Sequence, residues 1–278
     1  MSNNKTQSLL SAAPLGKKSS YVNTYAPNLL FPLPRQPKRD EIGIVGGLPF
    51  SGFDFWRGFE ISWLNPRGKP QVALGEFRFP CDSPFLIESK SFKLYLNSFN
   101  QSKMDSQEQV ASLMRSDLSQ AAGAPVEVGL FDLHQTSAKI IDLQGDSLDE
   151  LDIECTQYQP EPSYLMAQGN QVTETLHTHL LKSNCLVTGQ PDWGSLEISY
   201  TGQRIDREGL LKYVVSLRDH NEFHEQCVER IFMDLQRECH PKTLTVLARY
   251  TRRGGLDISP YRTSGINAGM PLERLVRQ

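Results

Sequence analysis

The chain has 278 residues, of which 38% are hydrophobic and 22% are charged, a composition typical of a globular protein. The net charge of −3 argues against a broad nucleic-acid interface, which needs a basic face. No apolar run approaches the roughly 18 residues of a membrane-spanning helix, and residues 1–30 lack the apolar core of a signal peptide. The five cysteines show no CxxC spacing and fit free thiols. We therefore expect a cytoplasmic protein.

Four segments follow one another along the chain. The N-terminal segment is rich in Ser, Asn, Pro and Lys and shows no periodicity, which predicts an extended arm. A later segment is acidic and contains Pro, which is typical of a connector. We expect the arm over 1–40, a first module over 41–141, the acidic connector over 142–171 and a second module over 172–278.

The two modules resemble each other in sequence. In each, a Trp begins a stretch of alternating residues that predicts a strand. A second apolar segment, which we also interpret as a strand, precedes a helix with an apolar face and a further strand. Leu118 follows Tyr95 by 23 residues, and Leu235 follows Tyr213 by 22. The matched segments are 56–63 and 193–200, 94–99 and 212–217, 108–118 and 225–235, and 125–130 and 243–250.

Antiparallel strands with helices gathered on one face of the sheet form an α+β module. Two such modules predict a pseudo-symmetric chain, and clefts form readily where modules meet. The polar residues differ between the two copies. We therefore expect one composite site for each pair of modules.

Cys185 is a candidate nucleophile because it lies among polar and turn-forming residues, in the segment SNCLVTGQPDW. Asp192 follows a Gly-Gln-Pro turn that could bring its carboxyl group back toward the sulfur. Such a carboxyl could act as a general acid if burial raised its pKa. The alternative is that Cys185 is a small buried hydrophobe and Asp192 caps a turn.

His224 and Glu225 lie at the predicted start of the second module's helix, where the helix dipole stabilises a carboxylate. The alternative is that Asn221 or His224 simply caps the helix. A zinc site is a weak interpretation, because His220 and His224 lack further ligands at reliable spacing.

Two further segments could bind phosphate. The ESKS segment places Lys90 and Lys93 with two serines beside Glu88, which could recognise a polar base. Near the C-terminus, Arg253 and its neighbours precede a Gly pair, which allows close approach of the backbone. The alternatives are a solvated helix start and an exposed loop. No GxGxxG follows a strand, so a Rossmann domain is unsupported.

Four motifs span most of the chain: ESKSFKLYLNSFN (88–100), CLVTGQPDW (185–193), NEFHEQC (221–227) and RRGGLDISP (252–260). Together they resemble the 7-cyano-7-deazaguanine reductases, the nitrile reductases of queuosine biosynthesis, in their longer two-module form. This resemblance implies the tunnelling fold, in which tandem α+β modules assemble into a barrel and bind purine-like rings where modules meet. It also implies NADPH as the cofactor, no metal, a deazaguanine substrate and a homodimer.

The resemblance also assigns residues to roles. It implies that Cys185 adds to the nitrile carbon to form a thioimide, and that Asp192 is the proton donor. Two NADPH would then complete the reduction to 7-aminomethyl-7-deazaguanine. The implied substrate-binding residues are Ile87, Glu88, Ser89, His224 and Glu225. The implied NADPH-binding residues are Ser89, Lys90, Arg253 and Gly254.

Two alternatives stay open. One is a metal-dependent, cyclohydrolase-like enzyme of the same fold that acts on a purine or pterin, although the sequence offers no convincing ligand set around Cys185. The other is a non-catalytic purine- or RNA-binding protein that uses the loop around Arg252 and Arg253. The net charge of −3 and the lack of aromatic residues among the basic ones argue against it.

Overall fold

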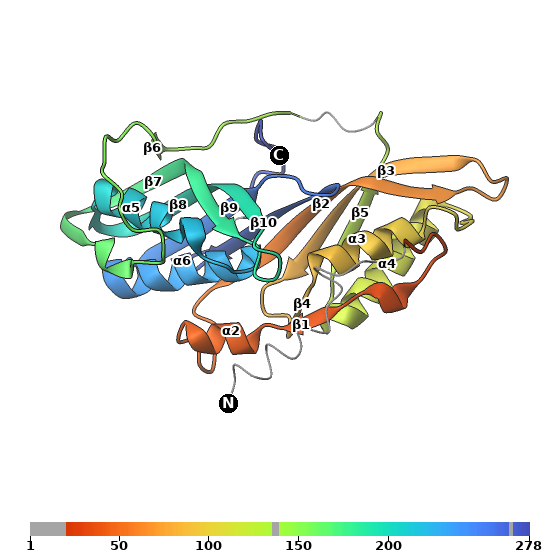
Figure 1. Ribbon diagram of the computed structural model, residues 1–278, viewed down its shortest axis with the longest axis horizontal. Coiled ribbons are helices and arrows are strands. Elements are labelled where there is room, and N and C mark those ends of the chain that lie inside the picture. The colour runs from red at the N-terminus through yellow and green to blue at the C-terminus, as the bar shows by residue number, and fades with distance from the viewer. Residues whose placement is uncertain (1–20, 135–138, 267–268) are drawn as a thin grey trace. The chain divides into compact units, whose positions relative to one another are not determined.

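The computed structural model describes residues 21–134, 139–266 and 269–278 (Figure 1). The chain forms two compact units. The first unit comprises the described parts of 1–41, 54–138 and 252–257. The second unit comprises the described parts of 42–53, 139–251 and 258–278. Among the described residues, no helix has the length and apolarity that a membrane crossing needs.

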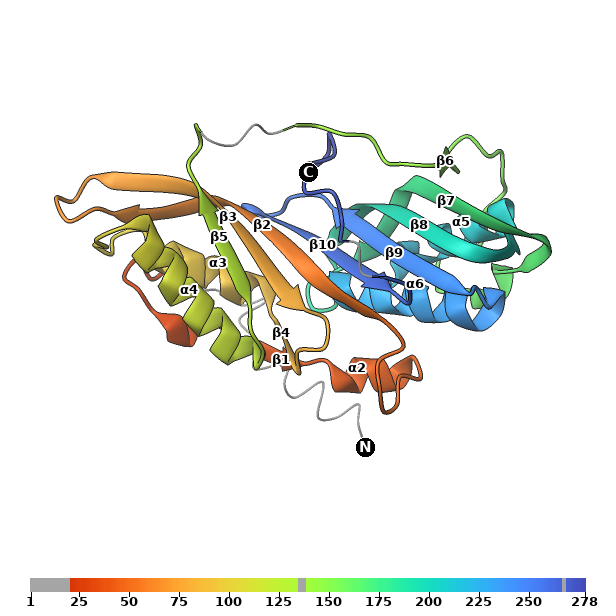
Figure 2. The same cartoon turned by 180° about the vertical axis from the view of Figure 1, so that it is seen from behind.

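The first unit contains a sheet with the strand order β5-β3-β2, and two helices that lie on one face of these strands (Figures 1 and 2). Phe92 contacts Trp56, Phe77 and Phe79 with ring centroids 5.0–6.2 Å apart, so one helix packs on strands β2 and β3 through aromatic side chains. The elements are β2 (Ser51–Leu64), β3 (Pro70–Pro80), β5 (Glu127–Phe131), α3 (Ser89–Ser98) and α4 (Gln107–Ala122).

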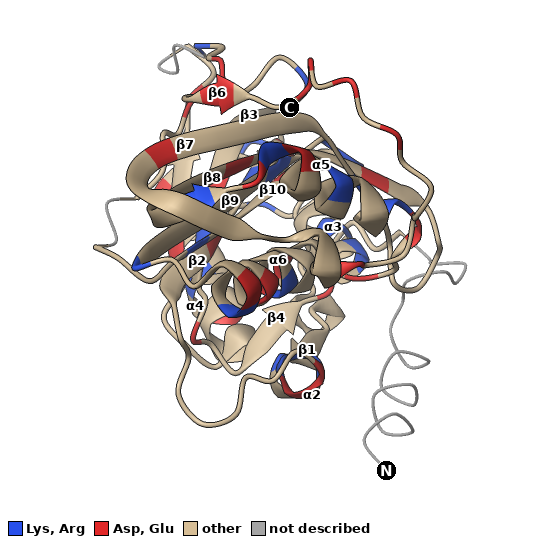
Figure 3. Ribbon diagram, turned by 90° about the vertical axis from the view of Figure 1, so that its left-hand side faces the viewer, with Lys and Arg blue, Asp and Glu red and all other residues tan. Residues whose placement is uncertain are grey.

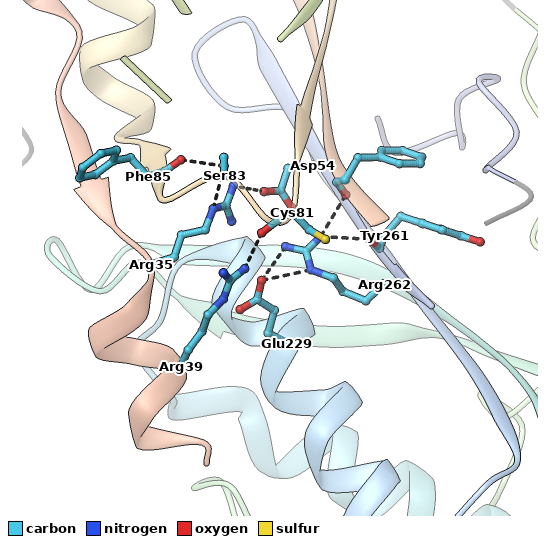
Figure 4. A network of polar contacts seen from close by, with 10 residues as sticks. Arg35, Arg39, Asp54, Cys81, Ser83, Phe85, Glu229, Tyr261 and Arg262 are labelled. Atoms are coloured by element: carbon cyan, nitrogen blue, oxygen red, sulfur yellow. Dashed lines mark hydrogen bonds and ion pairs between the residues drawn. The ribbon is translucent and has the colours of Figure 1, made fainter. Parts of the chain in front are cut away.

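The end of the predicted arm is part of the first unit. It contains η1 (Pro27–Leu29), β1 (Pro32–Pro34) and α2 (Gln36–Glu41), and β1 pairs antiparallel with β4 (Phe85–Ile87). Figure 3 shows both acidic and basic residues on α2. Figure 4 shows how buried polar groups fix this segment. Arg35 donates to Asp54 at 2.6 Å and to Ser83 at 3.2 Å, and Arg39 donates to the Cys81 carbonyl at 2.6 Å.

The second unit contains strands in the order β10-β9-β8-β7-β6. Strands β10, β9, β8 and β7 pair antiparallel with their neighbours, whereas β6 pairs parallel with β7. The 18-residue strand β7 begins within the segment predicted as connector. The elements are β6 (Asp146–Ser147), η2 (Pro162–Tyr164), β7 (Ala167–Asn184), β8 (Pro191–Ile205), α5 (Arg207–Ser216), η3 (Leu217–Asp219), α6 (His224–Cys239), β9 (Thr243–Tyr250) and β10 (Leu256–Thr263).

The strands predicted over 94–99 and 212–217 are wrong, because 94–98 lie in helix α3 and 212–216 lie in helix α5, with 217 in η3. The reason lies just upstream of each apolar run. The Glu88 and Asp206 side chains accept hydrogen bonds from backbone amides of the following turn and so begin a helix. The apolar run alone was too short to distinguish a strand from a buried helix.

The sequence repeat corresponds to equivalent hydrogen bonds in the two units. The Tyr95 hydroxyl donates to Asp117 at 2.6 Å, and the Tyr213 hydroxyl donates to Asp234 at 2.6 Å. Each bond joins the shorter helix of its unit to the longer one. The mainly antiparallel strands and the helices of both units confirm the predicted α+β class.

Candidate active site

Cys185 lies in a tight turn between strands β7 and β8. Its backbone amide donates to the Gln190 carbonyl at 2.8 Å, and the Gly189 amide donates to the Cys185 carbonyl at 3.0 Å. These two hydrogen bonds close the turn over 185–190. The residue is 8% exposed, so the turn holds its thiol in a largely desolvated position.

Asp192 and His224 are brought together in the second unit. Asp192 is the second residue of β8, pairs with Ser183 of β7, and has a buried side chain. Its Oδ1 lies 3.6 Å from Nε2 of His224, the first residue of α6. The His224 ring packs edge-on against Tyr250, with centroids 4.1 Å apart. A buried carboxyl beside an imidazole is an arrangement that can hold and pass a proton.

The start of α6 differs from the capping that the sequence suggested. The N-cap residue is Phe223, rather than Asn221 or His224, and its backbone amide donates to the Gln226 side chain at 3.4 Å. Glu225 follows in the first helical turn and is 3% exposed. The helix dipole favours a carboxylate at this position.

A buried ionic cluster lies beside this helix start, and the sequence reasoning missed it. The Glu222 carboxylate accepts hydrogen bonds from Arg230 at 2.7 and 2.9 Å, and its Oε2 lies 3.1 Å from Nε2 of His220. Burial alone would raise the pKa of Glu222, but its contacts with His220 and Arg230 outweigh burial and lower the pKa to about 2. Helical periodicity begins only at 224, so nothing in the sequence relates Glu222 to Arg230.

Two other thiols of the second unit are poor nucleophiles. Burial, reinforced by the Glu222 charge, raises the pKa of Cys227 to about 12. Burial and the Glu238 charge raise the pKa of Cys239 to about 12 as well. Both groups therefore stay protonated near neutral pH, and a protonated thiol is a poor nucleophile.

In the first unit, Glu88 caps helix α3. Its Oε1 accepts from the Lys90 amide at 2.6 Å and its Oε2 accepts from the Ser91 amide at 2.8 Å. Burial raises the pKa of Glu88, although these two amides and the charges of Lys93 and Lys90 act against the shift. Ile87 ends β4 immediately before and is buried, and Ser89 begins the helix.

A pocket of about 270 Å³ lies beside helix α3 in the first unit. Lys90 and Gly254, both predicted to bind the cofactor, line it together with Lys93. A Cβ atom at Gly254 would come within 3.1 Å of the Lys93 side chain, so a glycine allows this close approach. The remaining lining residues are Tyr21, Glu60, Leu94, Leu96, Asn97, Asn100, Gly255 and Leu256.

The arginines of the same loop have defined positions. The Arg252 guanidinium lies 3.8 Å from the centre of the Phe59 ring, a cation–π contact. The backbone amide of Arg253 donates to the Leu256 carbonyl at 2.9 Å and closes the turn. Sequence reasoning identified this loop but missed Glu60, Asn97 and Asn100. In the part of the chain that the structure describes, no group of three His, Cys, Asp or Glu side chains could hold a metal.

Comparison with family models gives the class of protein. A model described as "Nitrile reductase, 7-cyano-7-deazaguanine-reductase N-term" matches residues 21–130. A model described as "QueF-like protein" matches residues 191–268. Together the two matches cover well over half of the chain, and they place it in the nitrile reductase class.

Curated relatives match almost the whole chain. The NADPH-dependent 7-cyano-7-deazaguanine reductase of Ralstonia nicotianae is 59% identical, over 91% of this chain and 93% of the relative. The enzyme of the same name from Cupriavidus necator is 57% identical, over 98% and 100%. The chain therefore belongs to the family of NADPH-dependent 7-cyano-7-deazaguanine reductases, which are oxidoreductases. The family resemblance that the four motifs predicted is confirmed.

Among solved structures, an archaeosine synthase QueF-like protein in the apo form matches 37% of this chain, at 18% identity and a TM-score of 0.31. This match is too weak to bear on the fold.

Proposed function

We propose that this chain reduces the nitrile of 7-cyano-7-deazaguanine to the primary amine of 7-aminomethyl-7-deazaguanine, with two NADPH, in queuosine biosynthesis. The observation that carries the proposal is the arrangement around the Cys185 turn. A buried cysteine begins a turn that two backbone hydrogen bonds close, and the second residue of the strand that leaves this turn is the buried Asp192, 3.6 Å from His224. The names of the relatives supply the substrate class.

In the proposed reaction the Cys185 thiolate adds to the nitrile carbon, because a thiolate is the side chain best suited to a modest carbon electrophile. The addition breaks one C–N π bond and forms a C–S bond. The electron pair of the broken bond moves to nitrogen, where Asp192 delivers a proton and so gives a neutral thioimide. His224 lies beside the Asp192 carboxyl, with its Nε2 3.6 Å from Oδ1.

When bound, NADPH supplies hydride for each of the two reductions. Between them, departure of the Cys185 thiolate leaves an imine, which water would hydrolyse. The buried positions of Cys185 and Asp192 keep water away from that carbon. The chain's own contribution is thus a nucleophile, a proton and a dry environment.

The pocket of the first unit has the chemistry to hold the phosphates of NADPH. The ammonium groups of Lys90 and Lys93 suit phosphate charge, and the backbone at Gly254 allows close approach. Ser89 and Arg253 lie next to these residues in the chain and complete the proposed cofactor site. Asn97, one turn beyond Lys93 on α3, adds a neutral hydrogen-bonding group.

For the base, we propose Glu225 as the main recognition group. A deazaguanine presents a ring N–H and an exocyclic amino group side by side, and a carboxylate accepts from both. Glu88 serves the same base in the proposal, with Ile87 and Ser89 beside it and His224 beside Glu225. Since both oxygens of Glu88 already accept backbone hydrogen bonds, it contributes through its remaining lone pairs.

The chain is also proposed to be a homodimer of tandem tunnelling-fold modules in the cytoplasm. Strands β5 and β6 are edge strands, and an exposed strand edge needs a pairing partner. Closing several modules into a barrel removes these edges.

Stoichiometry tests the proposed reaction. Purified protein given 7-cyano-7-deazaguanine should oxidise two NADPH for each primary amine that forms, with no added metal. Oxidation of one NADPH for each product, or product formation without NADPH, would contradict the proposal.

A further inference from the structure

The Glu222 side chain is a buried charge in the second unit, just before the start of helix α6. Its side chain is only 1% exposed, yet its pairing with Arg230 and His220 keeps it ionised. A buried carboxylate is costly unless it is paired and hydrogen-bonded, and the two-pronged contact from Arg230 provides such a partner. The proposed chemistry assigns this charge no part.

The backbone of the same residue holds the chain next to Cys185. The Glu222 amide donates to the Asn184 carbonyl at 3.0 Å, and the Asn184 amide donates to the His220 carbonyl at 2.8 Å. Asn184 directly precedes Cys185. The segment 220–222 therefore fixes the point at which the Cys185 turn leaves strand β7.

The carboxylate of Glu222 also controls how the chain enters helix α6. Arg230 lies on that helix, whereas Glu222 precedes it, so their ion pair ties the approaching chain to the body of the helix. His224 and Glu225 follow Glu222 by two and three residues. The direction in which these two side chains leave the helix start depends on the same ion pair.

We propose that Glu222 is a positioning residue for nitrile reduction. By binding Arg230 it holds the backbone that carries Cys185 and the helix start that carries His224 and Glu225 in one fixed arrangement. The proposal rests on the proposed function, because it assumes that Cys185 is the nucleophile. Such residues matter because a displacement of about 1 Å at a reacting group can cost as much as 10²-fold in rate.

The test is the rate of thioimide formation in Glu222→Gln, followed by absorbance after mixing with 7-cyano-7-deazaguanine. Glutamine keeps the size of the side chain but removes its charge, so Arg230 loses its ion pair. We expect the adduct to form roughly 10- to 100-fold more slowly, while the apparent KM for NADPH stays unchanged.

The chain offers a matched control on the same helix. Glu229 forms a buried ion pair with Arg262 at 2.9 Å (Figure 4), but its backbone makes none of the contacts described above with the Cys185 segment. Glu229→Gln should lower the thermal stability as Glu222→Gln does and keep the wild-type rate of adduct formation. An equal loss of rate in both variants would overturn the positioning role.

If Glu222→Gln does not fold, the double variant Glu222→Gln/Arg230→Met replaces it, because removing both buried charges avoids an unpaired one. Slow adduct formation in this folded protein supports the proposal, and a wild-type rate in either variant overturns it. Cys185→Ala is measured in parallel. An adduct that persists there would refute the proposed function itself, which is a separate outcome.

Discussion

Asp192 lies inside the second unit with its side chain 2% exposed and its Oδ1 3.6 Å from His224. The carboxyl is therefore shielded from bulk water and lies beside an imidazole. In the proposed reaction its proton goes to the nitrile nitrogen. The alternative that the sequence left open, a turn cap, would give Asp192 no part in the chemistry.

Asp192→Asn separates the two roles. An amide cannot serve as a general acid, so we predict that thioimide formation slows by roughly 10²-fold or more. The affinity for the base, measured by calorimetry, should change little, because the amide keeps the shape of the side chain. A comparable loss of base binding would instead make Asp192 a structural residue.

The ionisation of Glu222 predicts a pH dependence of stability. The pKa of Glu222 is lowered from 4.5 to about 2 in the folded chain, so its stabilising contribution is complete above about pH 5. The contribution is lost as the pH falls through 4.5 toward 2, where the folded carboxylate takes up its proton. We predict that Glu222→Gln is less stable than the wild type at pH 7 and that the difference shrinks toward pH 3.

Urea unfolding at several pH values measures this difference. Glu238→Gln provides the control, since Glu238 pairs with Arg237 on the same helix but is partly exposed. Its stability should differ little from that of the wild type at any of these pH values. A gap between wild type and Glu222→Gln that is constant with pH would contradict the assignment of the low pKa to Glu222.

The sequence could suggest candidate residues that belong to motifs, and it missed those defined only by tertiary contacts. Cys185 and Asp192 could be named as candidates because a cysteine among turn residues, followed by an acid, is visible in one segment. The pairing of Glu222 with Arg230 depends on where helix α6 begins. Neither Glu222 nor Arg230 stands out among the charged residues near it in the sequence.

Among the elements, α3 and α5 are the instructive pair, because the sequence predicted a strand where each has a helix. The apolar residues of these two segments indicated burial, but the acidic residue upstream of each segment makes it a helix. Glu88 and Asp206 occupy the same cap position, seven residues before Tyr95 and Tyr213 respectively. The longer helices α4 and α6 were predicted correctly over 108–118 and 225–235, because apolar residues recur at helical spacing in the second segment and the first segment matches it in the repeat.

Glu88 and Asp206 both cap a helix, so comparing them separates the structural role of Glu88 from its proposed role in binding the base. Glu88→Ala and Asp206→Ala should each cost about 0.5–2 kcal/mol of stability, the usual loss for a helix cap. Only Glu88→Ala should also weaken binding of 7-cyano-7-deazaguanine, because only Glu88 is assigned to the base. Thermal unfolding and calorimetry measure the two effects, and unchanged base affinity in Glu88→Ala would reduce Glu88 to a cap.

At the scale of the whole molecule, the residues assigned to one reaction are divided between the two units. Glu88 and Lys90 belong to the first, whereas Cys185, Asp192 and Glu225 belong to the second. The proposed reaction therefore requires residues from both units, either of one chain or of two chains. The sequence could predict the division, because the motifs lie far apart, but it could not predict which chains combine.

Subunit mixing distinguishes the two possibilities. We predict a homodimer by sedimentation. Glu88→Ala, which should bind the base weakly, is mixed with inactive Cys185→Ala under conditions that allow exchange, at a substrate concentration at which neither variant alone turns over. Recovered NADPH oxidation places each site across two chains. No recovery, with exchange verified by a size-tagged chain, places each site within one chain. A fully active monomer would contradict the proposed dimer.

Covalent capture by Cys185 is the central claim, and one measurement tests it most directly. Protein is mixed with 7-cyano-7-deazaguanine without NADPH, and the adduct is followed by absorbance and by intact-protein mass. We predict a mass increase equal to one substrate molecule in the wild type, located on Cys185 after digestion, and none in Cys185→Ala. NADPH oxidation should vanish in that variant too. An adduct or sustained turnover in Cys185→Ala would contradict the account.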